Sequence, residues 1–240
     1  MSGHSKWSTI KHKKAKEDSK RGKLFTKLIK EITIAARLGG GDANANPRLR
    51  LLLDKAKEIN MPLENSQRAI RRGTGELPGM SYERYMYEGY GPGNSAVMVE
   101  VLTDNKNRAI GELRALFSRK GGILAEAGAV SWMFNKLGVI TLPKSDITED
   151  QLLENLLAHD VKDIKQIEDN GFVITTDLKA LEEVKQALIT MGLKPESAEV
   201  EWVPQTTISI PNPEIEEKAH DFLSALEDLD DVQEVYTNLE

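Results

Sequence analysis

The fold of this chain is decided by residues 137–204, which read LGVITLPKSDITEDQLLENLLAHDVKDIKQIEDNGFVITTDLKALEEVKQALITMGLKPESAEVEWVP. Two amphipathic segments, expected as helices at 148–158 and 178–191, are separated by runs rich in β-branched residues. Strands are expected at 138–142, 161–168, 171–176 and 197–203. Asp169-Asn170-Gly171 between the middle two strands is a strong hairpin-turn signal. The resulting order, β-α-β-β-α-β, is typical of a ferredoxin-like domain.

The segments on both sides of this stretch carry parts of the same pattern. Before it we expect a helix at 106–120 and strands at 84–90, 96–103 and 130–134. After it we expect a helix at 213–226 and strands at 206–210 and 232–236. Each half would leave an apolar sheet face uncovered, which favours pairing of the two halves. We therefore predict that the two halves form a second β-α-β-β-α-β (ferredoxin-like) α/β domain. This domain is discontinuous, 79–136 plus 205–240, and the ferredoxin-like α/β domain 137–204 is inserted into it.

The N-terminal third reads differently, as a basic arm followed by helices. An amphipathic helix is expected from Lys23 until Gly39-Gly40-Gly41, because glycine favours helix C-caps. A second should run from Pro47 to about Asn60, with Asn46 as its N-cap, and a third over about 63–72. Residues 1–78 are thus predicted as a helical N-terminal domain, and the whole chain as α+β.

Charge is divided unevenly between these parts. The formal net charge is −6, yet residues 1–78 hold 18 Lys/Arg against 8 Asp/Glu, a net of +10. The remaining residues hold 14 against 30, a net of −16. Such asymmetry indicates a nucleic-acid partner for the basic part. No apolar run is long enough for a membrane span, no secretory signal begins the chain and cysteine is absent, so we expect a cytoplasmic protein.

The basic arm at residues 1–22 gives the strongest chemical signal. Lys and Arg attract phosphate by displacing condensed counterions, and Trp7 or His4 could stack on a base. The plainer interpretation is a solvated charged tail. The candidate nucleic-acid contacts of the arm and the start of the first helix are His4, Lys6, Trp7, Lys11, Lys13, Lys14, Lys16, Arg21 and Lys23.

A second basic cluster lies in the predicted helices. Arg68, Arg71 and Arg72 are spaced i, i+3 and i+4, which places them on one helix face that can follow a phosphate backbone. Arg48 and Arg50 lie in the first turn of their helix, where free backbone N–H groups also favour anions. The alternative is that these arginines pair with Asp54, Glu58 and Glu64.

Two further motifs carry weaker signals. Residues 87–93, YEGYGPG, resemble a phosphate-binding glycine loop, but a strand rather than a helix follows, which favours a tight turn. Asp104, Asn105, Asn107 and Arg108 stand where a strand leads into a helix, a position suited to a functional site or simply to N-capping. No metal-ligand spacing and no nucleophile motif is present, so we expect no enzyme activity, cofactor, metal or small-molecule substrate.

Motifs along nearly the whole chain resemble the YebC family. They are GHSKWSTIKHKKAK at 3–16, AARLGGGDANANPRLR at 35–50, AKEINMP at 56–62, RAIRRGTGE at 68–76, YEGYGPG at 87–93, LTDNKNR at 102–108, VSWMF at 130–134 and DDVQEVYTN at 230–238. The resemblance implies a three-domain cytoplasmic protein, described in the family as a probable DNA-binding transcriptional regulator. Mitochondrial relatives are translational activators for cytochrome c oxidase, and bacterial relatives are also linked to translation on the ribosome. It implies nucleic-acid contacts from the arm and from both arginine groups.

Three functions remain open on the sequence. The first is a DNA-binding transcriptional regulator, and the second is an RNA- or ribosome-binding translation factor. The third is a protein adaptor that binds no nucleic acid and acts through its acidic α/β domains. Sequence-specific DNA readout usually uses a helix-turn-helix, zinc finger or zipper, and none is recognisable here.

Overall fold

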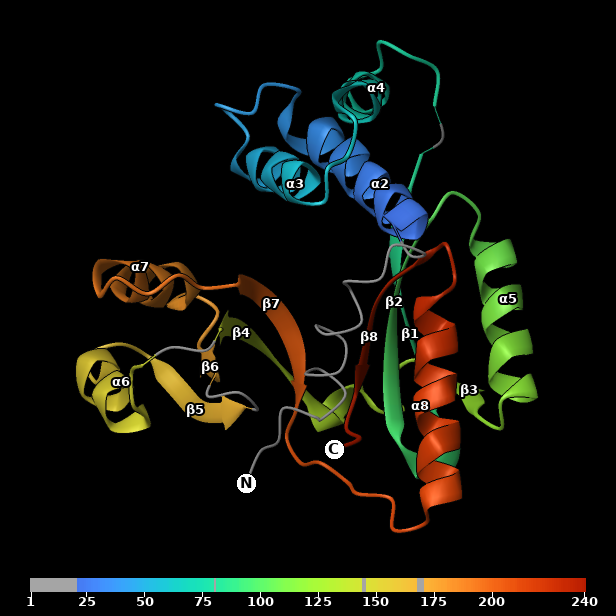
Figure 1. Cartoon of the computed structure of the whole chain (residues 1–240). Coiled ribbons are helices and arrows are strands. Elements are labelled where there is room, and N and C mark those ends of the chain that lie inside the picture. Colours follow the sequence, from blue (N-terminus) through green and yellow to red (C-terminus); the bar gives the residue numbers. More distant parts are fainter. Residues whose placement is uncertain (1–20, 80, 144–145, 168–170) are drawn as a thin grey trace. The chain divides into compact units, whose positions relative to one another are not determined.

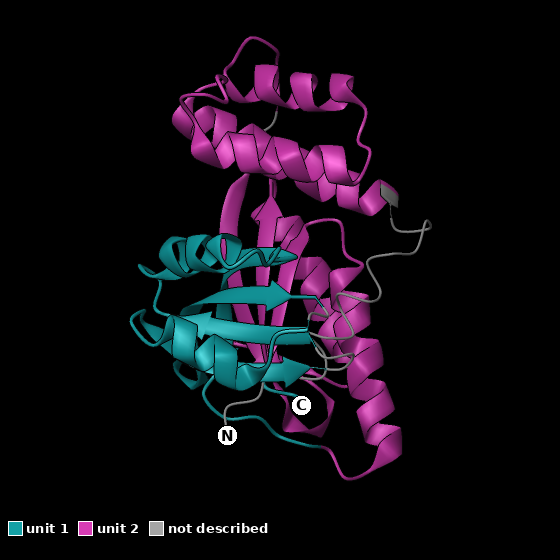
Figure 2. Cartoon of the chain, turned by 60° about the vertical axis from the view of Figure 1, so that its left-hand side comes forward, with its two compact units in different colours: residues 1–9, 132–209, 238–240 teal, residues 10–131, 210–237 magenta. Residues whose placement is uncertain are grey.

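The computed structural model describes residues 21–79, 81–143, 146–167 and 171–240. It confirms the predicted α+β class, because three N-terminal helices precede two four-stranded antiparallel sheets (Figure 1). Figure 2 shows two compact units. Among the described residues, unit 1 holds Trp132–Ser209 and Asn238–Glu240, and unit 2 holds 21–131 and Ile210–Thr237. The domain boundaries expected at 78, 136 and 204 stay a prediction.

The N-terminal part of unit 2 is a small helical domain with a core of its own. Its helices are α2 (Arg21–Gly39), α3 (Pro47–Glu58) and α4 (Leu63–Gly73). Buried apolar residues from all three helices meet in this core, among them Ile32, Leu49 and Ala69. A Cβ atom on Gly73 would lie 2.4 Å from the backbone oxygen of Thr33, so only glycine permits this approach of α4 to α2.

The sheet of unit 2 is covered on one face by two helices. Its strands, in spatial order, are β3 (Ile123–Ala125), β1 (Glu83–Tyr90), β2 (Ala96–Thr103) and β8 (Val232–Thr237). The covering helices are α5 (Lys106–Arg119) and α8 (Pro213–Glu227). Phe117 of α5 and Phe222 of α8 pack edge to face, with ring centroids 4.9 Å apart, and so join the two helices above the sheet.

Unit 1 has the strand order of a ferredoxin-like domain. The strands, in spatial order, are β5 (Val161–Ile167), β6 (Gly171–Thr176), β4 (Phe134–Leu142) and β7 (Ser197–Pro204). Its helices are α6 (Glu149–Leu156) and α7 (Leu181–Thr190), and their apolar residues share a core with the sheet. Residues 168–170, where the hairpin turn was predicted, lie outside the described residues.

The structure corrects two strands that the sequence predicted for the discontinuous domain, at 130–134 and 206–210. Residues 131–133 form a short 3-10 turn, and β4 begins only at Phe134. Residues 206–210 form no strand, and only Ile208 makes an isolated bridge, to Leu239. Instead β1 and the unpredicted β3 pair with each other and complete the four-stranded sheet. Ile208 is held in its bridge by the end of the chain, because its N–H donates to the backbone oxygen of Asn238 and its own oxygen accepts the N–H of Glu240.

Candidate nucleic-acid interface

The predicted basic contacts divide into those that the structure describes and those that it does not. His4, Lys6, Trp7, Lys11, Lys13, Lys14 and Lys16 lie outside the described residues. Arg21 is the first residue of α2, and its side chain is not described. The remaining six are Lys23, Arg48, Arg50, Arg68, Arg71 and Arg72.

Three of these six side chains have no carboxylate partner within the described part of the chain. Arg50 of α3 and Arg71 and Arg72 of α4 are exposed. Arg72 also lies close enough to Tyr82 to lower the pKa of that phenol, although burial of the phenol and the Asp104 carboxylate raise this pKa more strongly. These three arginines therefore keep guanidinium groups available to an external anion.

The other three side chains are already paired inside the molecule. Arg48 forms an ion pair with Glu31 of α2 at 2.8 Å, and Arg68 forms one with Glu64 at 2.5 Å, one turn earlier on α4. Lys23 contacts the carboxylate of Asp228 at 3.3 Å and the backbone oxygen of the same residue at 3.0 Å. Of the acidic partners expected for the arginines, Glu64 is thus confirmed for Arg68, whereas Asp54 pairs with Lys57.

The two arginine groups lie at opposite ends of their helices, so the helix dipole affects their charges in opposite ways. The side chain of Asn46 accepts the backbone N–H of Leu49 and so caps α3, as predicted, and no acidic residue stands in the first turn. Arg48 and Arg50 therefore lie near the positive end of the helix dipole, an unfavourable place for a cation. Arg71 and Arg72 lie in the last turn of α4, where a cation is favourable. The ion pair with Glu31 compensates Arg48 inside the molecule, whereas Arg50 has no acidic partner among the described residues.

A stripe of lysines on α2 holds the end of another helix. Lys23, Lys27 and Lys30 donate to the backbone oxygens of Asp228, Glu227 and Asp230, at 3.0, 3.0 and 2.8 Å respectively. These carbonyls lie at and just after the C-terminal end of α8, where intrahelical partners run out. The lysine charges also oppose the negative end of the α8 dipole. This stripe binds the helical domain to the α/β part of unit 2.

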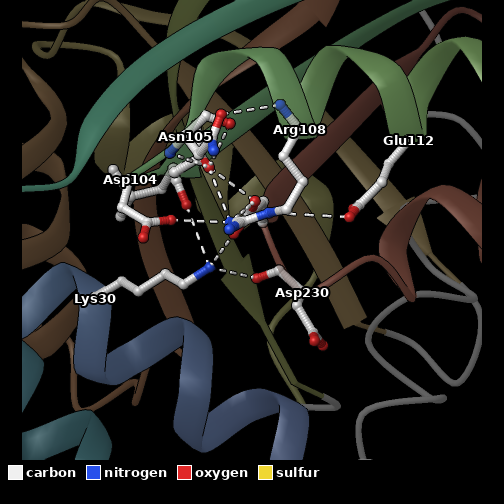
Figure 3. Close-up of polar contacts among 9 residues, drawn as sticks. Lys30, Asp104, Asn105, Arg108, Glu112 and Asp230 are labelled. Atoms are coloured by element: carbon white, nitrogen blue, oxygen red, sulfur yellow. Dashed lines mark hydrogen bonds and ion pairs between the residues drawn. The ribbon is translucent and has the colours of Figure 1, made fainter. Parts of the chain in front are cut away.

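The deepest contact of this stripe is a buried ion pair. Lys30 is 6% exposed, and its ammonium group donates to the Asp231 carboxylate at 2.5 Å and to the backbone oxygen of Leu102 at 3.3 Å. Together with the Asp230 oxygen these acceptors use all three of its N–H bonds. Figure 3 shows Lys30 approaching this cluster from α2 while Arg108 approaches it from α5.

The second oxygen of Asp231 binds two further donors. It accepts from the hydroxyl of Thr103 at 2.8 Å and from the guanidinium of Arg108 at 2.7 Å. Arg108 also contacts Asp104 at 2.9 Å, and Asn105 caps α5 by accepting the backbone N–H of Arg108 (Figure 3). In the motif at 104–108, Asn105 caps α5, as one of the two interpretations predicted, and Asp104 and Arg108 belong to the charged cluster around Asp231.

The protonation state of the cluster follows from these bonds. Burial alone would raise the pKa of Asp231, but hydrogen bonds from Lys30, Arg108 and Thr103 outweigh burial and lower it. The same bonds, from Asp231 first and then from Asp104, raise the pKa of Arg108. The cluster is thus an ionised joint with its hydrogen bonds made, and not a site poised for proton transfer.

Sequence reasoning missed Lys30 and Asp231 as members of this cluster. A signal for Lys30 was present, because it stands between Ile29 and Ile32 in the apolar part of α2. Asp231 ends the acidic run EDLDD at 227–231, and nothing in that run distinguishes it from the other acidic residues. Its partners are remote in sequence, 128 residues for Thr103 and 201 for Lys30, and no local pattern encodes them.

A chain of alternating charges connects the helical domain to the sheet of unit 2. Glu31 accepts from Arg48 and from Arg84 of β1, and Arg84 also pairs with Glu100 of β2. Glu31 and Glu100 are mostly buried, so these carboxylates depend on their arginine partners. Arg48 is consequently one end of a structural network.

The glycine motif at 87–93 covers the end of β1 and the tight turn after it, as the strand that follows the motif predicted. The backbone N–H of Gly91 donates to the backbone oxygen of Ser95 at 2.8 Å, and Gly93 has a positive φ of 72°. No helix begins there to bind an anion, because residues 92–94 form one short 3-10 turn before β2.

Two negative findings apply to the described ranges. No group of His, Asp and Glu side chains there is arranged to hold a metal ion. No helix there is long and apolar enough to cross a membrane.

Comparisons with known proteins match both parts of the chain. Residues 5–76 match the TACO1/YebC protein N-terminal domain, and residues 82–239 match the TACO1/YebC second and third domain. A probable transcriptional regulatory protein of Chloroherpeton thalassium is 53% identical over all of this chain and 96% of its own length. One from Geobacter sulfurreducens is 51% identical over the same shares. A conserved hypothetical protein of Aquifex aeolicus, known as a crystal structure, superimposes with a TM-score of 0.83 at 45% identity, covering 94% of this chain and 93% of that one.

Proposed function

Because the chain belongs to the TACO1/YebC family, we propose that it is a regulator of gene expression that binds nucleic acid through its N-terminal helical domain. Relatives that are about half identical over their full length bear the name probable transcriptional regulatory protein. The proposal includes cytoplasmic location and no enzymatic activity. It assigns the acidic α/β regions to roles other than phosphate contact.

The observation that carries this proposal is the set of arginines that lack an internal acceptor. Among the described residues, Arg50, Arg71 and Arg72 are exposed and make no ion pair, and they stand in a segment of net charge +10. A phosphate backbone is the common ligand of such a surface, because each contact releases condensed counterions. Arg48 and Lys23, which have internal partners, are weaker candidates.

The arrangement of α3 and α4 favours contacts to phosphates over readout of base sequence. Four residues join the two helices, a length also found in helix-turn-helix motifs. In such a motif the N-terminal residues of the second helix contact base edges. In α4 those positions include Glu64, while the arginines stand in the C-terminal half. Contacts to phosphates without readout of bases fit a DNA-binding regulator. They also support the second candidate function, an RNA- or ribosome-binding translation factor.

The test is the salt dependence of binding by the full chain. We expect the triple variant Arg50→Gln/Arg71→Gln/Arg72→Gln to bind more weakly and to show a slope of log affinity against log salt that is smaller by about 2 to 3, one phosphate contact for each arginine. Fluorescence anisotropy with labelled duplex DNA and with labelled single-stranded RNA measures both quantities. The nucleic acid that binds more tightly at equal salt distinguishes the two candidate functions.

A matched control removes equal charge from the other part of the chain. Lys162, Lys179 and Lys194 are exposed residues of unit 1, and their replacement by Gln changes the net charge by the same amount. We expect the slope of this control to equal that of the unchanged protein. Equal slopes for all three proteins, or no binding of either nucleic acid, would contradict the proposal.

A further inference from the structure

Within the described ranges, the chain passes between the two units at three places, which we call the first, second and third crossing. They lie after Ser131, after Ser209 and after Thr237 (Figure 2). Each crossing is a covalent link between two compact bodies. The hydrogen bonds beside the crossings therefore determine how freely the units can move against each other.

The second and third crossings are joined to one another, within unit 1. The backbone N–H of Ile208 donates to the oxygen of Asn238 at 2.8 Å, and the oxygen of Ile208 accepts the N–H of Glu240 at 2.9 Å. Ile208 and Leu239 thus form a short parallel bridge. Two segments that run side by side act as one narrow link, and a link of a few residues between compact bodies is the usual place for a hinge.

The first crossing is fixed on its unit 2 side by the carboxylate of Glu88 in β1. Glu88 is 6% exposed and accepts the backbone N–H groups of Gly128, Val130 and Ser131 at 2.9, 2.8 and 2.8 Å. Burial alone would raise the pKa of Glu88, but the hydrogen bonds from these residues outweigh burial and lower it. The carboxylate is therefore ionised at neutral pH, and bonds to an ionised acceptor are stronger than neutral ones.

Two further features fix the same loop, residues 126–131. The hydroxyl of Tyr90 donates to the backbone oxygen of Ala129 at 3.1 Å. Gly128 has a φ of 91°, a left-handed conformation that only glycine adopts without strain. Gly89 stands against Phe117 of α5, so its neighbours in β1 project from the opposite face of the sheet. The loop is thus bound to the face that α5 and α8 leave uncovered.

The first crossing is fixed on its unit 1 side as well. The side-chain amide of Gln205 donates to the backbone oxygen of Trp132 at 2.9 Å, and the backbone N–H of Gln205 donates to the oxygen of Met133 at 2.9 Å. Only three residues, at most about 10 Å of extended chain, separate Gln205 from the bridge at Ile208. The first crossing is therefore held at both ends and begins beside the other two.

We propose that the bonds between Glu88 and loop 126–131 restrain a hinge between the two units. While the loop is closed, the first crossing prevents rotation about the joined second and third crossings. When the loop opens, only the joined pair remains, and the units move more freely. The inference goes beyond the proposed function, because it holds whether or not nucleic acid is bound.

The first experiment measures the distance between the units in the full chain by double electron–electron resonance. The chain has no cysteine, so Ala115→Cys in unit 2 and Ala158→Cys in unit 1, both at exposed positions, place spin labels at two sites only. We expect Glu88→Gln to broaden the distance distribution, because an amide offers the loop one acceptor oxygen in place of two. We expect Gly128→Ala to broaden it too. A Cβ atom there meets nothing within 4 Å, so alanine acts through the positive φ alone.

The second experiment measures the opening of the loop itself. Elastase cleaves after small apolar residues, and residues 126–131 read EAGAVS. We expect Glu88→Gln to increase the rate of cleavage in this loop roughly 10- to 100-fold. This range corresponds to the loss of one charge-assisted hydrogen bond when cleavage follows the population of the open loop. Mass spectrometry identifies the cleaved bond.

Two matched controls lie elsewhere in unit 2. Gly121→Ala introduces alanine at a φ of 80°, again with nothing within 4 Å of its Cβ, in the turn after α5. Glu83→Gln makes the same change of charge at an exposed position of β1. We expect neither control to change the distance distribution or the cleavage of loop 126–131. Circular dichroism establishes which variants fold, and Gly128→Ala carries the test if Glu88→Gln does not.

Three results would overturn the inference. Faster cleavage without a broader distance distribution would mean that the loop opens but restrains no hinge. A broader distribution without faster cleavage would mean that something other than this loop holds the units. Equal broadening in Gly121→Ala or Glu83→Gln would trace the effect to general destabilisation. None of these measurements involves nucleic acid, so each leaves the proposed function untouched.

Discussion

At the scale of single residues, Asp231 supplies the negative charge that allows Lys30 to be buried between the helical domain and the α/β part of unit 2. Its carboxylate is the sole side-chain acceptor of Lys30 in the described ranges and also binds Arg108 and Thr103. We expect Asp231→Ala to lower the free energy of unfolding by about 3–5 kcal/mol, because Lys30 would remain buried without a counter-charge. Urea unfolding followed by circular dichroism measures the change.

The neighbouring Asp230 offers a control for that prediction. Asp230 is exposed, and Lys30 contacts only its backbone oxygen. Alanine has the same backbone oxygen, so the replacement keeps this contact. We expect Asp230→Ala to change the free energy of unfolding by less than about 0.5 kcal/mol. Equal losses in the two variants would show that the Asp231 carboxylate has no special role.

Acid should weaken the protein through the same carboxylate. The pKa of Asp231 is lower in the folded chain than its usual value near 3.8, as is that of Glu88 relative to 4.5. Their stabilising contribution is therefore complete above the unfolded-state pKa and is lost as the pH falls through the folded-state pKa. We expect the free energy of unfolding to fall steadily below about pH 4.

The variant Asp231→Asn separates this effect from general acid denaturation. Asparagine cannot titrate, so its unfolding free energy should fall less steeply over the same range, although it starts lower. Urea titrations at a series of pH values give both slopes. Parallel pH profiles for the variant and the unchanged protein would mean that Asp231 has the same pKa folded and unfolded.

At the scale of helices and strands, Glu31 of α2 controls the availability of Arg48 on α3. It binds both Arg48 and Arg84, so Arg48 contributes little to an external surface while the network is intact. We expect Glu31→Gln to release Arg48 and to increase the salt slope of nucleic-acid binding by about 0.7–0.9, the value of one added phosphate contact. Anisotropy titrations over a range of salt concentrations measure it.

Glu58→Gln serves as the matched control for Glu31→Gln. Glu58 is exposed on α3, and its replacement makes the same change in net charge. We expect this variant to change the affinity slightly and the slope by less than Glu31→Gln does. If both variants shift the slope equally, general charge and not the release of Arg48 explains the effect.

Local signals in the sequence predicted most elements but not how every strand is paired. The end of α2 at Gly39 and the start of α3 after Asn46 were predicted from the preferences of glycine and of N-cap residues. These preferences depend on only a few adjacent residues. The strand expected at 130–134 was wrong because remote Glu88 binds the backbone N–H groups of this loop. β3 was missed because it has three residues, too few for a visible alternation.

The candidate site was predictable by residue type and not by partner. The excess of arginine in the helical domain is evident in the sequence, and the local pairing of Arg68 with Glu64 was expected from it. The pairing of Arg48 depends instead on where α2 places Glu31. Arg48 and Arg50 illustrate this, since they are two residues apart and only Arg48 reaches Glu31. Long-range contacts of this kind become visible only in the folded chain.

At the scale of the whole molecule, the change from net positive to net negative charge coincides with the change from the helical domain to the α/β part of the chain. The excess of basic residues lies in the helical domain. Three of them, Lys23, Lys27 and Lys30, bind backbone oxygens at the C-terminal end of α8. We propose that an external phosphate is bound by Arg50, Arg71 and Arg72, which have no carboxylate partner among the described residues. We expect the acidic remainder to repel phosphate, so that the proposed nucleic-acid contacts lie in the N-terminal part.

The most direct test of this account is a map of the residues that contact nucleic acid in the full chain. The full-length protein is photo-crosslinked to single-stranded RNA and to DNA that carry thio-substituted bases, and the linked peptides are identified by mass spectrometry. We predict crosslinks within residues 1–78. Crosslinks confined to the acidic segments 137–204 and 213–227 would contradict the account.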